Sequence, residues 1–258
     1  MNQIKKNRFI LLTALIAVFF VVGFAAYADH SWGTYHWART ANPFTLKLGD
    51  NVSSTWDGHL ATTSSDWSLS SILDTAVVAG LTSSSSCKPT TGRAEICNRK
   101  YGFNGWLGVA SIWITGDHIT KGTVKLNDSY FNTSTYNKPE WRQFVMCQEV
   151  GHIFGLDHQD IDFDNANLGS CMDYTSDPAS NQHPNQHDYD QLELIYSHLD
   201  SSTTVNQSLP SRNGNGNDVD ESLQWGKAVK KSSDGKPSLY VRDLGNGEKV
   251  FNFIIWAN

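Results

Sequence analysis

The chain lacks several features that would assign it to common functional classes. It has no basic stripe and no long run of Lys or Arg, and its formal net charge is −6, so we expect no nucleic-acid partner. It has four cysteines but no C-x-x-C pair, which argues against a cysteine-ligated metal site. No internal repeat is visible. What remains, with 39% hydrophobic and 18% charged residues, is enough apolar sequence for a globular core.

One long apolar stretch is present, at the N-terminus. Residues 9–24 carry no charge, follow Lys5, Lys6 and Arg8, and precede the small-x-small pattern at 26–28. This arrangement predicts a secretory signal peptide at residues 1–28, cut after Ala28. The alternative is an uncleaved anchor, because the stretch approaches the roughly 18 residues that span a bilayer. Either way the rest of the chain is expected outside the cytoplasm, and the cleaved form is expected to be secreted without stable membrane association.

Export changes the expected net charge of the chain and the expected state of its cysteines. Removing residues 1–28 takes away three of the 20 Lys and Arg and none of the 26 Asp and Glu, so the net charge falls from −6 to −9. Four cysteines in an exported chain predict two disulfides, with three connectivities open. Cys87 and Cys97 flank a turn-rich segment that a local bridge would close, which leaves Cys147 to pair with Cys171.

The pattern along the chain predicts an α+β protein. Alternating apolar residues indicate strands at 42–52, 105–114 and 122–128, whereas 66–80 fits either a helix or a buried strand. A helix is expected to begin at Pro139 and to be ended by Gly155. A second helix is expected at 184–200, where an apolar stripe recurs at helical spacing.

The sequence changes character after Asp200. Residues 201–218 are rich in Ser, Asn and Gly, which predicts a flexible linker. The tail at 239–256 is typical of a β-hairpin that turns at Gly245-Asn246-Gly247. The C-terminal β segment, residues 219–258, is too small to fold alone, so we expect it to pack on the main domain at 29–200.

The segment 147-CQEVGHIFGLDHQD-160 carries the residues that are candidates for a metal or catalytic site. Gln148 and His152 are one helical turn apart, so both side chains lie on one face and can converge on one ion. Gly155 lets the chain leave the helix sharply, and His158 can then return as a third ligand. Glu149 lies beside that face, where it can hold a water. Three protein ligands and one open position are what a catalytic zinc site requires.

These residues resemble a known motif. The run from Gln148 to His158 is similar to the long zinc motif of the metzincin metallopeptidases and differs from it only at Gln148, where the family has His. Residues 170-SCMDY-174 resemble the Met-turn of those enzymes, with Met172 beneath the metal. The resemblance covers about residues 42–200 and is sharp over 148–174. It implies a metzincin-like catalytic domain with a twisted mixed sheet, an active-site helix, the Met-turn and a C-terminal helix.

The resemblance also implies a role for each residue. One Zn²⁺ would be held by Gln148, His152 and His158. Glu149 would be the general base that activates a water, and Tyr174 would either ligate zinc at rest or donate to the oxyanion. The substrate would be a peptide or protein, the strand at 108–114 would be an edge that pairs with the extended substrate, and the protein is expected to be a monomer.

Gln148 leaves three outcomes open, because an amide oxygen is a harder donor than imidazole and suits zinc less well. Zinc binds through Gln148, His152 and His158 with lower affinity, or it is held by the two histidines with Tyr174 and water, or the site holds no metal. The leading hypothesis is a secreted zinc endopeptidase. The alternative is a catalytically inactive, metzincin-like pseudopeptidase that acts as an extracellular binding protein.

A weaker pattern concerns calcium. Asp160, Asp162 and Asp164 alternate as at the start of an EF-hand loop, but the glycine at loop position six and the closing Glu are missing. Ca²⁺ is therefore a weakly supported second cofactor, and a solvated acidic loop is the expected form of this segment.

Overall fold

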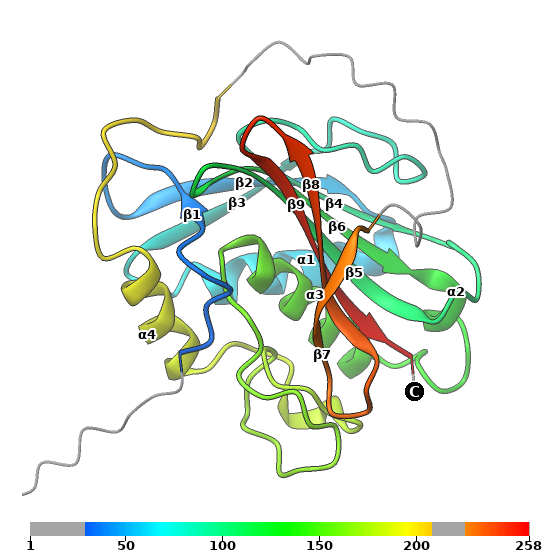
Figure 1. Ribbon diagram of the computed structural model, residues 1–258. Coiled ribbons are helices and arrows are strands. Elements are labelled where there is room, and N and C mark those ends of the chain that lie inside the picture. The colour runs from blue at the N-terminus through cyan, green and yellow to red at the C-terminus, as the bar shows by residue number, and fades with distance from the viewer. Residues whose placement is uncertain (1–28, 208–224, 258) are drawn as a thin grey trace, which may run out of the picture.

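The computed structural model describes residues 29–207 and 225–257 (Figure 1). The expected signal peptide at 1–28 lies outside the described residues. Among the helices that are described, none is both long enough and apolar enough to cross a membrane.

A single twisted mixed sheet of nine strands organises the molecule. Its order is β3-β2-β4-β6-β5-β9-β8-β7, and the short β1 pairs with β6. The strands β1 to β4 and β6 pair in parallel with one another, whereas β5 and the three C-terminal strands are antiparallel to their neighbours. The strands are β1 His36–Trp37, β2 Phe44–Asn51, β3 Leu73–Ala79, β4 Ala94–Arg99, β5 Trp106–Thr115, β6 His118–Asn127, β7 Lys227–Lys231, β8 Pro237–Gly245 and β9 Glu248–Trp256.

Two long helices cover one face of this sheet. Helix α1 (Ser54–Trp67) and helix α3 (Pro139–Ile153) contact each other and both contact the sheet (Figure 1). Helix α3 is buried along nearly its whole length because it lies between α1 and the sheet. The short α2 (Asp128–Phe131), the 3₁₀ turn η1 (Pro178–Ser180) and α4 (Gln186–Ile195) complete the helices of the described residues.

The ends of α3 follow from its sequence. Pro139 stands at the start, where its missing N–H costs nothing. After Phe154 the chain turns at Gly155, whose φ is +100°. A Cβ at Gly155 would lie 2.7 Å from the Tyr35 carbonyl oxygen, so only glycine fits here. This turn sends the chain back toward the helix, as the sequence predicted.

Most predicted elements are present, with instructive exceptions. The strands expected at 42–52, 105–114 and 122–128 are β2, β5 and β6, and residues 66–80 hold the end of α1 followed by β3. Strand β4 lies partly in the turn-rich segment between Cys87 and Cys97, where no strand was expected. Its residues Ala94–Asn98 are all buried between β2 and β6, so no alternation marks it.

Helix α4 is shorter than expected. The prediction ran to residue 200, but α4 ends at Ile195. The Arg39 guanidinium donates to the Tyr196 carbonyl at 2.6 Å and also to the His198 carbonyl. These carbonyls bond to a distant side chain, and the chain beyond Ile195 runs on in a non-helical conformation.

The segment expected to be a linker is only partly described. Residues 201–207 lie on the main domain, since Thr204 N–H donates to the Ala38 carbonyl at 2.9 Å and Asn206 N–H to the Gly92 carbonyl at 2.8 Å. Val205 between them is buried. Residues 208–218 lie outside the described residues.

The C-terminal segment extends the main sheet. The predicted hairpin is present as β8 and β9, and its turn includes Asn246 at a φ of 55°. Strand β9 then pairs with β5 from Trp106 to Thr115, which brings the red end of the chain beside the green β5 (Figure 1). Strand β5 therefore has neighbours on both sides. The prediction that residues 108–114 form a free edge for substrate is wrong, because alternation along a strand does not reveal what pairs with it.

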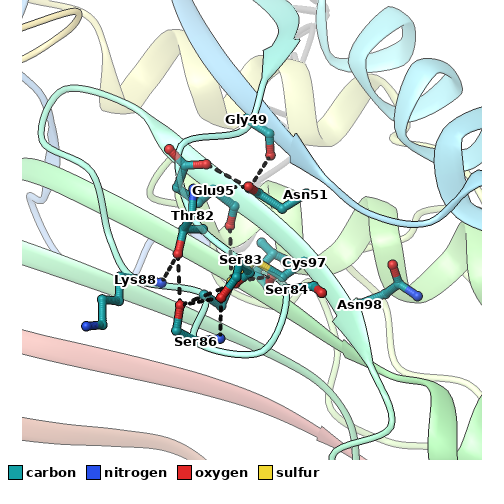
Figure 2. The surroundings of a disulfide bond; sticks show 12 residues. Gly49, Asn51, Thr82, Ser83, Ser84, Ser86, Lys88, Glu95, Cys97 and Asn98 are labelled. Carbon is teal, nitrogen blue, oxygen red and sulfur yellow. Dashed lines mark hydrogen bonds between the residues drawn. A yellow bond between two sulfur atoms is a disulfide. The ribbon is translucent and has the colours of Figure 1, made fainter. Parts of the chain in front are cut away.

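Both predicted disulfides form, Cys87–Cys97 and Cys147–Cys171. Figure 2 shows the surroundings of the first bridge, which closes the loop between β3 and β4. Nearby, the Asn51 amide donates to the Gly49 carbonyl at 3.1 Å and to the Glu95 carboxylate at 2.7 Å. From the loop, the Thr82 N–H donates to Asn51 Oδ1 at 3.2 Å and the Leu81 N–H donates to Glu95 Oε2 at 3.2 Å. The loop is thus held to β2 and β4 by side-chain hydrogen bonds as well as by the disulfide.

Candidate metal centre

The last two turns of α3 bring the predicted site residues against the middle of the sheet. Gln148 and Glu149 are 0% and 1% exposed. Glu149 faces β5 at a glycine: a Cβ at Gly108 would lie 2.7 Å from Glu149 Oε1. The sheet therefore approaches the helix closely because residue 108 has no side chain.

Two imidazoles face each other at this point. His152 Nε2 lies 3.1 Å from His158 Nε2, and His152 Nδ1 lies 2.8 Å from the Leu156 carbonyl oxygen. Because a carbonyl only accepts, Nδ1 carries the proton, and the Nε2 lone pair of a neutral His152 points toward His158. Ligand atoms at bonds of 2.0–2.1 Å from a tetrahedral zinc are about 3.3 Å apart. The spacing of the two nitrogens is therefore close to that of zinc ligands.

On the adjoining turn of α3, four buried polar atoms have no hydrogen-bond partner. They are both side-chain atoms of the Gln148 amide and both carboxyl oxygens of Glu149. Unpaired buried polar groups are rare because each costs desolvation energy that nothing repays. An amide oxygen left free next to two facing imidazoles fits a third ligand of a cation, and a free carboxyl beside them fits a partner for a bound water.

Burial shifts the pKa values of Glu149 and His152. It raises the pKa of Glu149 well above its ordinary value, an effect that the nearby Ala110 backbone only partly offsets. Burial also lowers the pKa of His152 well below its ordinary value, and the neighbouring His158 lowers it further. Burial therefore favours the neutral form of His152, which is the form that ligates metals, and the protonated form of Glu149.

The turn around Met172 lies beneath α3. A Cβ at Gly151 would stand 2.4 Å from Met172 Sδ, so the methionine packs directly under the helix backbone. The Gln159 N–H donates to the Met172 carbonyl at 2.7 Å, which joins this turn to the segment that carries His158. The Cys147–Cys171 bridge fastens the same turn to α3 covalently.

Tyr174 completes the set of predicted residues. Its ring centroid lies 4.3 Å from that of His158, and its hydroxyl donates to the Ile254 carbonyl at 3.3 Å. The structure thus brings His152, His158 and Tyr174 into contact, with Gln148 and Glu149 on the adjoining turn of α3. Phe163 stacks on the other side of Tyr174, with a centroid distance of 4.6 Å.

Several residues at this site were not predicted from sequence, and most come from the C-terminal strands. Phe253 of β9 stacks on His152 with centroids 4.2 Å apart, and Lys230 of β7 forms an ion pair with Asp157. A surface pocket whose lining includes Asp157, His158 and Lys230 lies beside the centre, and His158 is the one predicted site residue that lines it. The alternation of the tail predicted strands but carried no signal of where they would pair.

Neither a protein-family model nor a curated protein matches this chain by sequence. The chemistry of the site is therefore inferred from its own geometry.

The acidic run beyond His158 is organised by local turns. The Asp162 N–H donates to Asp160 Oδ1 at 2.6 Å, and the Asp164 N–H donates to Asp162 Oδ1 at 3.0 Å. These two carboxylates thus accept hydrogen bonds from the backbone two residues on, as is usual in Asx turns.

Proposed function

We propose that this chain is an exported, metzincin-like zinc endopeptidase whose centre is formed by Gln148, His152 and His158. The observation that carries the proposal is the pair of imidazole nitrogens 3.1 Å apart beside an unpartnered amide and an unpartnered carboxyl. The mixed sheet, the site helix and the turn at Met172 support it. Two disulfides support an oxidising compartment.

Zinc in such a site polarises a peptide carbonyl and lowers the pKa of a bound water. The chain's own residues supply the remaining steps. Glu149 takes a proton from the attacking water and returns it to the leaving amine. Because burial is what raises its pKa, entry of water lowers that pKa and prepares the carboxylate to act as a base. The Tyr174 hydroxyl, once free of the Ile254 carbonyl, donates to the oxyanion.

In this proposal the described form is latent. Strand β9 pairs along β5, and Phe253 covers His152. Substrate can bind only after the hairpin β8–β9 moves away or is removed. Displacing the hairpin breaks the pairing of β9 with β5 and leaves the pairs among β1 to β6 intact.

The second candidate is a catalytically silent protein that binds an extracellular partner. The same covering of His152 by Phe253 favours it, as does Gln148 in place of a stronger ligand. In that case β9 is a permanent strand of the sheet, and the centre serves only to hold α3 to the turn at Met172.

Three full-length proteins separate the candidates: wild type, Gln148→His and Glu149→Ala. The measurements are zinc affinity and cleavage of a mixed peptide library, each with and without Phe253→Ala to uncover the site. The peptidase proposal expects wild type to cleave when uncovered, Glu149→Ala to keep zinc but lose cleavage, and Gln148→His to bind zinc at least tenfold more tightly. If only the Gln148→His protein cleaves, the chain is the silent candidate.

A further inference from the structure

A second cluster of histidines lies away from the candidate centre. His36 of β1, His118 at the start of β6 and His198 after α4 all direct Nε2 at one oxygen, Oδ1 of Asp200. The three N–O distances are 3.3, 3.2 and 3.7 Å respectively. Among the described residues, His36, His198 and Asp200 are also the one group of at least three His, Cys, Asp or Glu side chains whose donor atoms all lie within 4.8 Å of one another.

The hydrogen bond of His36 to a backbone carbonyl sets the tautomer of its ring. His36 Nδ1 lies 2.7 Å from the Thr34 carbonyl oxygen, and a carbonyl only accepts, so Nδ1 carries the proton. In the neutral ring, Nε2 then presents a lone pair to the Asp200 carboxylate oxygen 3.3 Å away. Two lone pairs at this distance repel each other unless a proton or a metal ion lies between them.

The Arg39 guanidinium pairs with the other carboxylate oxygen, since Arg39 Nη1 is 3.1 Å from Asp200 Oδ2. A divalent cation satisfies every lone pair with one charge centre.

We propose that His36, His198 and Asp200 form a second zinc site, with a water completing the four ligands. Imidazole and carboxylate ligands suit zinc, and ligand atoms of a tetrahedral zinc stand about 3.3–3.5 Å apart. The distances from Asp200 Oδ1 to the His36 and His198 nitrogens, 3.3 and 3.7 Å, are close to that value. This site is separate from the centre at His152 and does not depend on the peptidase proposal.

The cluster is held in place as metal ligands usually are. The second carboxylate oxygen of Asp200 accepts from the Arg39 backbone N–H at 3.0 Å and from its guanidinium, which leaves Oδ1 for the ion. The Thr34 carbonyl fixes the tautomer of His36, as partners behind ligating histidines commonly do. The side chains of His118 and His198 are 37% and 55% exposed, so the ion can enter from solvent.

The location of the site indicates a structural role. Its ligands come from two segments far apart in sequence, the strand β1 and the chain that follows α4. A single ion would therefore brace the entry of the N-terminal segment and the exit of the chain after α4.

The test compares zinc binding by full-length wild type, His198→Ala and the control His183→Ala. His198 and His183 are similarly exposed, at 55% and 57%, and each lies near one aspartate, so neither change threatens folding. The readout is the difference in zinc equivalents and affinity between the proteins, measured by chelator competition, which does not depend on whether the His152 centre also binds. We expect His198→Ala to lose one equivalent or to bind it at least tenfold more weakly.

A second readout is the visible spectrum after substitution with Co²⁺, which reports the geometry of its ligands. We expect a tetrahedral component that His198→Ala removes and His183→Ala retains. Equal zinc content and affinity in wild type and His198→Ala would overturn the proposal. An equal loss in both variants would also overturn it, because the binding would then belong to surface histidines in general.

Discussion

The phenyl ring of Phe253 lies flat on the imidazole of His152, with centroids 4.2 Å apart and an angle of 14° between the planes. One ring comes from the last strand of the chain and the other from the helix of the candidate centre. The contact closes that centre, and it does so with a residue that no local pattern connects to it. Access to His152 is therefore controlled by the pairing of β9 with β5.

Replacing Phe253 with Ala should open the centre and lower stability. Truncation of a buried Phe typically costs about 3–5 kcal/mol in free energy of unfolding, and it removes the ring that covers His152. We expect zinc to bind faster, measured by stopped-flow with a zinc indicator, and the protein to unfold at lower denaturant concentration. Phe103→Ala is the control, since that side chain is 75% exposed. An unchanged zinc association rate in a folded Phe253→Ala protein would contradict the covering role.

Gly151 is expected to tolerate no side chain. Its Cβ would meet Met172 Sδ at 2.4 Å and Trp67 at 2.8 Å, so Gly151→Ala should lower the free energy of unfolding by about 1–3 kcal/mol through overpacking. Gly58 of α1 is the matched control, because a Cβ there meets nothing within 4 Å. Gly58→Ala should raise stability by about 0.5–1 kcal/mol. Urea unfolding of both proteins gives the comparison, and a Gly151→Ala protein as stable as wild type would show that Met172 moves freely.

The two disulfides should differ in their effect on the centre. Removing Cys147–Cys171, which closes a loop of 24 residues, or Cys87–Cys97, which closes one of 10, should each cost roughly 3 kcal/mol by loop entropy. Only the first bridge ties α3 to the turn at Met172. We therefore expect double Cys→Ser replacement at 147 and 171 to weaken zinc binding, whereas replacement at 87 and 97 leaves the affinity unchanged. Equal affinity in both variants would mean that packing alone positions the turn.

Acid should loosen the contact between β7 and the centre. Burial raises the pKa of Asp157, but hydrogen bonds and charges from His158 and Lys230 outweigh burial and hold that pKa below its ordinary value of 3.8. A lowered folded-state pKa stabilises the fold above about pH 4 and loses that contribution as pH falls through the folded value. Lys230→Met should raise the pKa of Asp157, so acid unfolding of the chelator-treated protein should begin at higher pH.

Lys227→Met is the control for that experiment, since it removes an exposed lysine from the same strand. The effect of Lys230→Met on stability near neutral pH should stay within about 1 kcal/mol, because its ammonium is half exposed. Identical acid midpoints for the two variants would show that Lys230 does not act on Asp157.

The sequence by itself determined the local parts of this protein. Proline and glycine marked the ends of α3, alternation marked β2, β5, β6 and the hairpin, and spacing placed His152 and His158 where one ion can meet both. These features depend on neighbours along the chain or on one helical turn, so local patterns contain them. Strand β4 was missed because a strand buried on both sides shows no alternation.

Only the tertiary structure decided what surrounds the candidate centre. The pairing of β9 with β5, the ring of Phe253 on His152 and the meeting of His36, His118 and His198 at Asp200 all join residues distant in sequence. Such contacts arise from how the whole chain packs and leave no periodic trace in any one segment. Long-range pairing therefore decides whether a strand edge is free, whether a site is covered and whether a histidine cluster forms. That pairing is set by burial of the entire core.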